Sequence, residues 1–394
     1  MRCGLSSSQV TPDAVEGKPD ETQNQLLWTS PGATPHPLAV VKRAIERSGC
    51  RHMVRRFAFL PTILFRGVTR RHLLILVTLL GLPIWIICWW STTAPDLVLQ
   101  NKPMVFVGGH PRSGTTLMRV MLDVHPMIRC GPETHILPRL LMQLSAFNIG
   151  FNRKRLIQAG LYPKAINEAY AAFIHTLIRL AGEDAPVLCN KDPLTLKFIN
   201  DLSAIIPTAK FILMVRDGRA VVNSLVRRAI RIGPNILTPM EMFIRWENIT
   251  WGMLKQCDSL GPATCHMLRY EDLVLRPQEQ MKQVLGFIGV PWDPIVLRHA
   301  TTLGEGTVLN SMEPSTSQVQ YPINTVPLYS WALPNSTLPD EIRLQSHMFS
   351  ELLYRLNYAN FPPNYGVAEK EILNQTEKLI RDRNFRRHFF DFIN

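Results

Sequence analysis

The residues best suited to chemistry in this chain lie in a short polar turn between an apolar run and a helical pattern. Residues 104–109 are apolar, residues 110–114 read His-Pro-Arg-Ser-Gly, and an amphipathic stretch begins at Thr115. A strand that enters a glycine-bounded turn and then a helix forms a cradle for phosphate-like anions, because the helix N-terminus presents free N–H groups. The turn is therefore the first candidate for a binding site.

The glycine spacing of this turn resembles a Walker A loop, but its cation differs. Gly109 and Gly114 stand where that loop has its two glycines, whereas Thr115 occupies the lysine position. This disfavours nucleoside triphosphate hydrolysis. Arg112 supplies a cation instead, and its guanidinium can hold a phosphate or sulfate group through two hydrogen bonds. The sequence predicts an anion site formed by Arg112, Ser113, Gly114, Thr115 and Thr116.

Strand and helix patterns alternate through the rest of the chain and predict an α/β fold, a P-loop-like parallel sheet flanked by helices. Ligands of such sheets collect beyond the carboxyl ends of the strands. The predicted strands are 104–109, 186–190, 210–216 and 264–269, and the predicted helices are 115–124, 164–180, 193–205, 218–230 and 277–289.

Polar motifs follow four of these strands. Besides the turn at 109–114, they are Cys-Asn-Lys-Asp-Pro at 189–193, Val-Arg-Asp-Gly-Arg at 215–219 and Arg-Tyr-Glu-Asp at 269–272. Because parallel strands end at one edge of the sheet, we expect these motifs to meet there.

An uncharged apolar segment divides the chain. Residues 73–90 comprise 18 residues without a charge and end in two tryptophans, as membrane-spanning helices do. A buried core helix is the alternative, because Pro83 lies within the segment. Arginines at 66, 70 and 71 precede it, so the N-terminus is expected in the cytosol and the remainder in the lumen. The expected parts are a basic, largely disordered cytosolic tail (1–72), a transmembrane signal anchor (73–90), a stem (91–102), a catalytic domain (103–366) and a C-terminal extension (367–394).

Cysteines and glycosylation sequons agree with an oxidising lumen. Four of the seven cysteines follow the apolar segment, and four cysteines allow three pairings. Buried free thiols are the alternative to disulfides. No Cys/His spacing resembles a zinc site, so no metal requirement is expected. The cysteines are Cys130, Cys189, Cys257 and Cys265, and the sequons begin at Asn248, Asn335 and Asn374.

Together these motifs resemble the tyrosylprotein sulfotransferase family, whose members use 3′-phosphoadenylyl sulfate (PAPS). The resemblance covers roughly residues 103–366. It is carried most specifically by GGHPRSGTTLMR at 108–119, LCNKDP at 188–193, AKFILMVRDGRA at 209–220 and FPPNYG at 361–366.

The resemblance implies a sulfotransferase fold and sulfuryl transfer from PAPS to tyrosine hydroxyls. The expected partners are acidic, tyrosine-containing secretory or membrane proteins and a second copy of the chain, with no nucleic acid. The expected location is the Golgi membrane, as a single-pass type II protein. The resemblance also implies the disulfides Cys130–Cys189 and Cys257–Cys265.

Residue roles are carried over from the family position by position. Glu133 matches the general base, although an acid at a helix N-terminus is its alternative explanation. Arg112 matches the arginine that steadies the sulfuryl group, and Lys191 and Ser315 match groups that face the leaving oxygen. The resemblance assigns the 3′-phosphate to Arg216, Ser224 and Arg228, the adenosine to Tyr270, the closing loop to Thr316, Ser317, Gln318, Val319 and Asn324, and the acceptor to His135 and Arg139.

The chain departs from the family at several of these positions. Pro132 replaces one of two consecutive acids, His135 replaces an arginine, and Ser330 replaces a lysine that contacts PAPS. Histidine gains charge between about pH 8 and 5, so His135 suggests a pH-sensitive acceptor site. Two other functions stay open: a Golgi carbohydrate sulfotransferase and a non-catalytic binding protein of the same fold. Glu133, Arg139 and the FPPNYG segment favour protein tyrosine.

Overall fold

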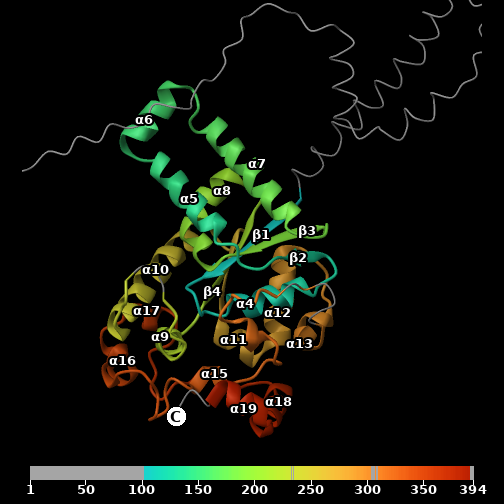
Figure 1. The fold of residues 1–394 in the computed structure, drawn as a ribbon, viewed down its shortest axis with the longest axis vertical. Coiled ribbons are helices and arrows are strands. Elements are labelled where there is room, and N and C mark those ends of the chain that lie inside the picture. Colours follow the sequence, from blue (N-terminus) through green and yellow to red (C-terminus); the bar gives the residue numbers. More distant parts are fainter. Residues whose placement is uncertain (1–101, 232, 234, 303–306, 308, 391–394) are drawn as a thin grey trace, which may run out of the picture. The chain divides into compact units, whose positions relative to one another are not determined.

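A computed structural model describes residues 102–390, apart from 232, 234, 303–306 and 308 (Figure 1). The expected cytosolic tail, the membrane anchor at 73–90 and nearly all of the stem lie outside the described residues. Within the described part of the chain, no helix has the length and apolar character needed to cross a membrane.

The core of the fold is a five-stranded sheet in the order β2-β3-β1-β4-β5, and every neighbouring pair is parallel. All six residues of the central strand β1 are buried, as expected for a strand covered on both faces. Its apolar sequence therefore shows no alternation. The strands are β1 (Met104–Gly109), β2 (Ile128–Cys130), β3 (Val187–Lys191), β4 (Lys210–Val215) and β5 (Cys265–Arg269).

Helices lie on both sides of this sheet (Figure 1). Helix α4 packs against β1, β2 and β3, whereas α7 packs against β3 and α10 against β4 and β5. The α-helices are α4 (Thr115–Asp123), α5 (Ile136–Phe147), α6 (Gly150–Gln158), α7 (Lys164–Leu180), α8 (Ile199–Ile205), α9 (Gly218–Arg227), α10 (Pro239–Leu260), α11 (Tyr270–Leu275), α12 (Pro277–Ile288), α13 (His299–Thr302), α14 (Thr316–Val319), α15 (Val326–Tyr329), α16 (Asp340–Gln345), α17 (Glu351–Arg355), α18 (Lys370–Arg381) and α19 (Arg383–Phe390). The 3₁₀-helices are η2 (Pro193–Phe198), η3 (Pro294–Arg298) and η4 (Ser346–Met348).

The predicted parallel sheet and its flanking helices are confirmed, although several elements differ from the prediction or were absent from it. The helix expected at 193–205 divides into the 3₁₀-helix η2 and the α-helix α8. Proline at its first position and a tight 3₁₀ turn are both common where a helix begins. Strand β2 was not predicted, because it is three residues long and carries Arg129 at its centre.

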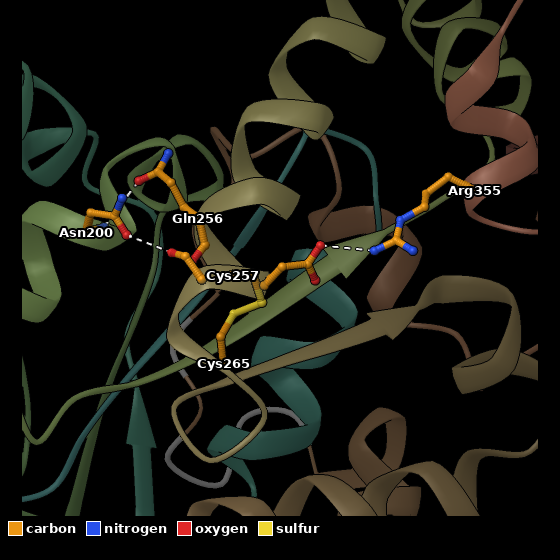
Figure 2. Close-up of a disulfide and its surroundings, with 7 residues drawn as sticks. Asn200, Gln256, Cys257, Cys265 and Arg355 are labelled. Carbon is orange, nitrogen blue, oxygen red and sulfur yellow. Dashed lines mark hydrogen bonds and ion pairs between the residues drawn. A yellow bond between two sulfur atoms is a disulfide. The ribbon is translucent and has the colours of Figure 1, made fainter.

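Both expected disulfides are present. Cys130 and Cys189 are register partners on neighbouring strands β2 and β3, and their sulfurs are bonded. Cys257, near the end of α10, is bonded to Cys265 at the start of β5. Figure 2 shows this second disulfide beside the contact of Asn200 with Gln256, which ties α10 to α8. Each disulfide therefore fixes an element at an edge of the sheet.

A buried polar cluster anchors the C-terminal third of the domain to β4. Asp217 accepts hydrogen bonds from Arg219 at 2.8 Å and from the hydroxyl of Tyr365 at 2.9 Å. The Tyr365 hydroxyl accepts the indole N–H of Trp331 at 2.9 Å, and Arg219 stacks on that indole. Tyr365 of the FPPNYG segment thus links Trp331 to Asp217, which follows the end of β4.

Candidate active site

The predicted phosphate loop joins β1 to α4 and needs glycine at both of its ends. A side chain at Gly109 would overlap the carbonyl of Met214, and one at Gly114 would overlap the ring of Tyr270. Gly114 also has φ 94°, in the left-handed region that glycine tolerates best. Arg112 has φ 75° although it carries a side chain, which is an uncommon conformation that concentrates at functional sites.

Arg112 connects three parts of the site through one guanidinium. Nε donates to Ser224 Oγ at 2.9 Å, Nη1 donates to Ser315 Oγ, and Nη2 donates to Gln318 Oε1 at 2.5 Å. Burial, together with the positive charges of Arg228 and Arg216, lowers the pKa of Arg112 from 12.5 to about 9. An anion bound among these three arginines would relieve their mutual repulsion.

A pocket opens beside this arginine cluster. Arg216 lies over the ring of Tyr270, with its guanidinium carbon 4.4 Å from the ring centre, and donates to the backbone oxygens of Arg112 and Pro327. Its Nε is buried without a hydrogen-bond partner among the described residues. The pocket is lined by the predicted residues Arg112, Gly114, Thr115, Thr116, Arg216, Tyr270, Ser315, Gln318, Val319 and Asn324, together with Leu117, Val274, Tyr321, Pro322, Ile323 and Pro327.

Some predicted donor-site residues lie outside this lining. Ser113 is buried within the loop, and Ser224 reaches the site only through Arg112. The Thr316 hydroxyl donates to the backbone oxygen of Asn310, at 2.5 Å, and so stabilises its own segment. Arg228 caps the end of α9, where burial lowers its pKa. Ser317 is partly exposed and does not line the pocket.

The C-terminal extension supports the wall of this pocket, which the sequence did not reveal. Gln375 donates to the backbone oxygen of Ile323 at 2.8 Å, and the Thr376 hydroxyl accepts the N–H of Thr325 at 3.1 Å. The ring of Phe385 meets Tyr321 edge to face. Helices α18 and α19 therefore pack directly behind the segment that forms one side of the pocket.

A second group of charged side chains lies at the end of β3. Lys191 is fully buried, and its Nζ donates to Glu133 Oε1 at 2.5 Å, to Glu313 Oε2 at 2.7 Å and to Thr116 Oγ1 at 3.3 Å. The structure thus brings together the predicted residues Glu133 and Lys191. Glu313 was missed, and its only sequence signal is its place two residues before Ser315.

The predicted acceptor side is more open. His135 precedes α5 with an exposed side chain, and its backbone N–H donates to Asp192 Oδ1 at 3.0 Å. Its Nε2 lies 3.7 Å from Glu133 Oε2. Arg139 is exposed about one turn further along α5. Residues at the start of α5 therefore form a rim beside the Glu133 carboxylate.

Three groups on this rim lie close enough to hold a metal ion. Ligand atoms of Glu133, His135 and Asp192 are within 4.8 Å of one another. Asp192 already accepts hydrogen bonds from His135 and from the Thr134 hydroxyl, and Glu133 is paired with Lys191. Burial raises the pKa of Asp192, which disfavours its ionised, metal-binding form. Protein contacts alone account for this cluster.

The sequon asparagines lie in different surroundings. Asn335 is exposed in a non-helical segment, whereas Asn248 and Asn374 are exposed on α10 and α18. The threonines of the two helical sequons, Thr250 and Thr376, are buried. Asn335 therefore offers the most accessible of the three sequons.

Comparison with known proteins connects this geometry to a family. Residues 103–294 match the description "Sulfotransferase family". The chain is 39% identical over 297 residues to protein-tyrosine sulfotransferase A of Caenorhabditis elegans, covering 74% of this chain and 77% of that protein. It is 40% identical over 288 residues to protein-tyrosine sulfotransferase 2 of Gallus gallus and 38% over 288 to protein-tyrosine sulfotransferase 1 of Homo sapiens, in both cases covering 72% of this chain and 77% of the relative. The chain belongs to the protein-tyrosine sulfotransferase family.

Proposed function

We propose that this chain transfers the sulfuryl group of PAPS to tyrosine hydroxyls in acidic segments of proteins. The observation that supports this most directly is the Glu133–Lys191 pair beside the arginine-lined loop. Such a transfer needs a base on one side of the sulfur and cations around the sulfuryl group. It also needs a group at the leaving oxygen that donates a proton or stabilises the negative charge. The site holds a side chain suited to each of these tasks.

The residues at the loop fit an anionic nucleotide. Arg112, Arg216 and Arg228 form a cationic cluster, and Arg216 Nε is a buried donor with no protein partner among the described residues. We assign Arg216, Ser224 and Arg228 to the 3′-phosphate and Tyr270 to the adenosine. The N–H groups at the start of α4 add donors that point out of the helix.

The co-substrate supplies an activated sulfuryl group. Transfer forms a bond from the phenolic oxygen to sulfur and breaks the bond from sulfur to the bridging oxygen of the phosphosulfate. We assign Glu133 Oε2 to receive the phenol proton, because Oε1 is held by Lys191. Arg112 stabilises the sulfuryl oxygens, and Lys191 and Ser315 stabilise the charge that develops on the leaving oxygen. No step assigned to these residues uses a metal ion.

The acceptor side favours an acidic protein segment over a sugar. His135 and Arg139 lie at the exposed start of α5, where they can contact carboxylates that flank the acceptor tyrosine. The opening is a surface rim, so an extended chain can pass over it. We also propose that the protein acts as a Golgi type II membrane protein, on the basis of the apolar segment at 73–90.

A homodimer completes the proposal. Helices α5, α6 and α7 project from one end of the domain (Figure 1). Between α5 and α6 they expose Phe147, Ile149 and Phe151, whose exposed fractions are 38%, 68% and 73%. Exposed apolar side chains that follow one another so closely favour a covered surface. A second copy of the chain is the partner we assign to them.

The direct test is sulfate transfer from labelled PAPS by the full-length protein in detergent. The acceptors are an acidic tyrosine peptide, the same peptide with phenylalanine, and a panel of sugars. Label on the tyrosine peptide alone is expected. Label on sugars would move the acceptor class to carbohydrate, and PAPS binding without any transfer would indicate a non-catalytic binding protein.

A further inference from the structure

We propose that Glu313 is a positioning residue of the transfer site, which fixes the base and the lysine relative to each other. The inference rests on the proposed function and adds a residue that the family motifs did not indicate. Glu313 is 6% exposed and lies in the segment that leads to Ser315.

Both oxygens of the Glu313 carboxylate are used. Oε1 accepts the backbone N–H of Glu133 at 2.7 Å, and Oε2 accepts Lys191 Nζ at 2.7 Å. The two contacts join residues 180 and 122 positions away in the chain. One carboxylate therefore sets the distance between the segment that carries the base and the strand end that carries the lysine.

The contacts of Lys191 show why a second carboxylate is needed. An ammonium group has three N–H donors, and those of Lys191 meet Glu133, Glu313 and Thr116. When Glu133 takes up the phenol proton it loses its negative charge. A buried ammonium without a counter-ion is costly, so Lys191 would then tend to lose its proton. Glu313 provides a second carboxylate beside the Lys191 ammonium while the leaving oxygen gains charge.

Other charges around this pair do not replace Glu313. Asp192 is next to Lys191 in the chain, but burial raises its pKa. Arg112 and Arg119 face Glu133 from the loop and from α4, and both are cations. His135 faces Glu133 from the solvent side. Glu313 is thus the second carboxylate in direct contact with the Lys191 ammonium among the described residues.

The backbone of Glu313 links this pair to the donor pocket. Its N–H donates to the oxygen of Asn310 at 3.1 Å, and its oxygen accepts the N–H of Thr316 at 3.0 Å. The same turn presents Ser315 to Arg112. Fixing Glu313 therefore aligns the base and lysine with the arginine that faces the sulfuryl group.

The test compares Glu313→Gln and Glu313→Asp with the wild-type full-length protein, using Met312→Gln as a matched control. Met312 is 86% exposed on the same segment and lies outside the site. We expect Glu313→Gln to lower kcat on the order of 100-fold, the size of effect seen when catalytic groups are misplaced by about 1 Å. Binding of the product adenosine 3′,5′-bisphosphate should stay at the wild-type level.

The pH profile separates positioning from simple structural support. In Glu313→Gln the Lys191 ammonium loses one of its two carboxylate partners, so the alkaline limb of kcat should move to lower pH. Glu313→Asp keeps the negative charge, so the alkaline limb of its kcat profile should match that of the wild type. Its kcat should lie between those of the wild type and Glu313→Gln.

A Glu313→Gln protein with wild-type kcat and an unchanged alkaline limb overturns the proposal. Parallel loss of nucleotide binding and kcat in both variants also overturns it, because that pattern indicates a structural role. Failure of the wild-type protein to sulfate the tyrosine peptide would instead refute the proposed function, and with it the reaction that Glu313 serves.

Discussion

The most informative single substitution is Arg112→Lys, because it keeps a cation while removing the guanidinium fork. Arg112 makes three side-chain contacts, to Ser224, Ser315 and Gln318. A lysine side chain has one nitrogen and can keep about one of these three contacts. Hydrogen bonds to charged groups contribute about 1.5–3 kcal/mol each, so losing two removes ~3–6 kcal/mol of positioning. If this free energy is lost from the transition state, kcat/KM should fall by about 10²–10⁴.

The substitution also introduces a pH dependence whose sign can be worked out. Burial, followed by the charges of Arg228 and Arg216, lowers the pKa of Arg112 from 12.5 to about 9, so the arginine stays charged at pH 7. The same surroundings would lower the pKa of the introduced lysine below its reference of about 10.4. The charged fraction of this lysine would then be larger at pH 6 than at pH 8. Residual activity should therefore rise as pH falls from 8 to 6.

The assay is the initial rate of peptide sulfation between pH 6 and 8, for Arg112→Lys and for Ser224→Ala. The second variant removes one contact of Arg112 but keeps its guanidinium, so it should lose rate without gaining the pH dependence. Normalising both to the wild-type profile removes contributions from other groups. An Arg112→Lys protein with the wild-type rate, or with a profile parallel to that of Ser224→Ala, would refute the reasoning.

Three further outcomes are expected. Glu133→Ala should lower kcat by about 10²–10⁴ and leave nucleotide binding intact by equilibrium titration; turnover near the wild-type level would mean that another group is the base. His135→Arg should remove the tighter binding of an acidic peptide that we expect at pH 5.5 relative to pH 7.5, and equal pH slopes in both proteins would count against a role for the imidazole. Tyr365→Phe leaves the buried Trp331 indole N–H without its acceptor, so stability should fall by about 2 kcal/mol. Calorimetry should show a Tm lower by roughly 5 °C for Tyr365→Phe. The control Tyr354→Phe, at an exposed tyrosine, should keep the wild-type Tm.

The donor side of the site could be predicted because its signals are local. The apolar run at 104–109, the two glycines and the helical pattern after them lie within about twenty residues, and each has a direct structural cause. Gly114 must lack a side chain because Tyr270 lies against it. The strands were recognised for the same reason, since buried parallel strands read as continuous apolar runs.

The remaining parts depend on contacts between distant residues. Glu313 meets Lys191 across 122 positions, and nothing near it in sequence shows that it is buried. The packing of α18 behind Ile323 is equally invisible, because its amphipathic pattern does not say which surface it covers. Strand β2 is too short to give a periodic signal and is recognised only by its neighbour β3.

The disulfide between Cys130 and Cys189 shortens the covalent path between the proposed base, Glu133, and Lys191. Through the backbone, Glu133 and Lys191 are separated by 58 positions. Through the disulfide, Glu133 lies three residues from one bonded cysteine and Lys191 lies two residues from the other. In the oxidised unfolded chain, their encounter is thus a short-range event with a high effective concentration. Formation of the disulfide therefore turns the Glu133–Lys191 contact from a long-range contact along the chain into a local one along the cross-linked chain.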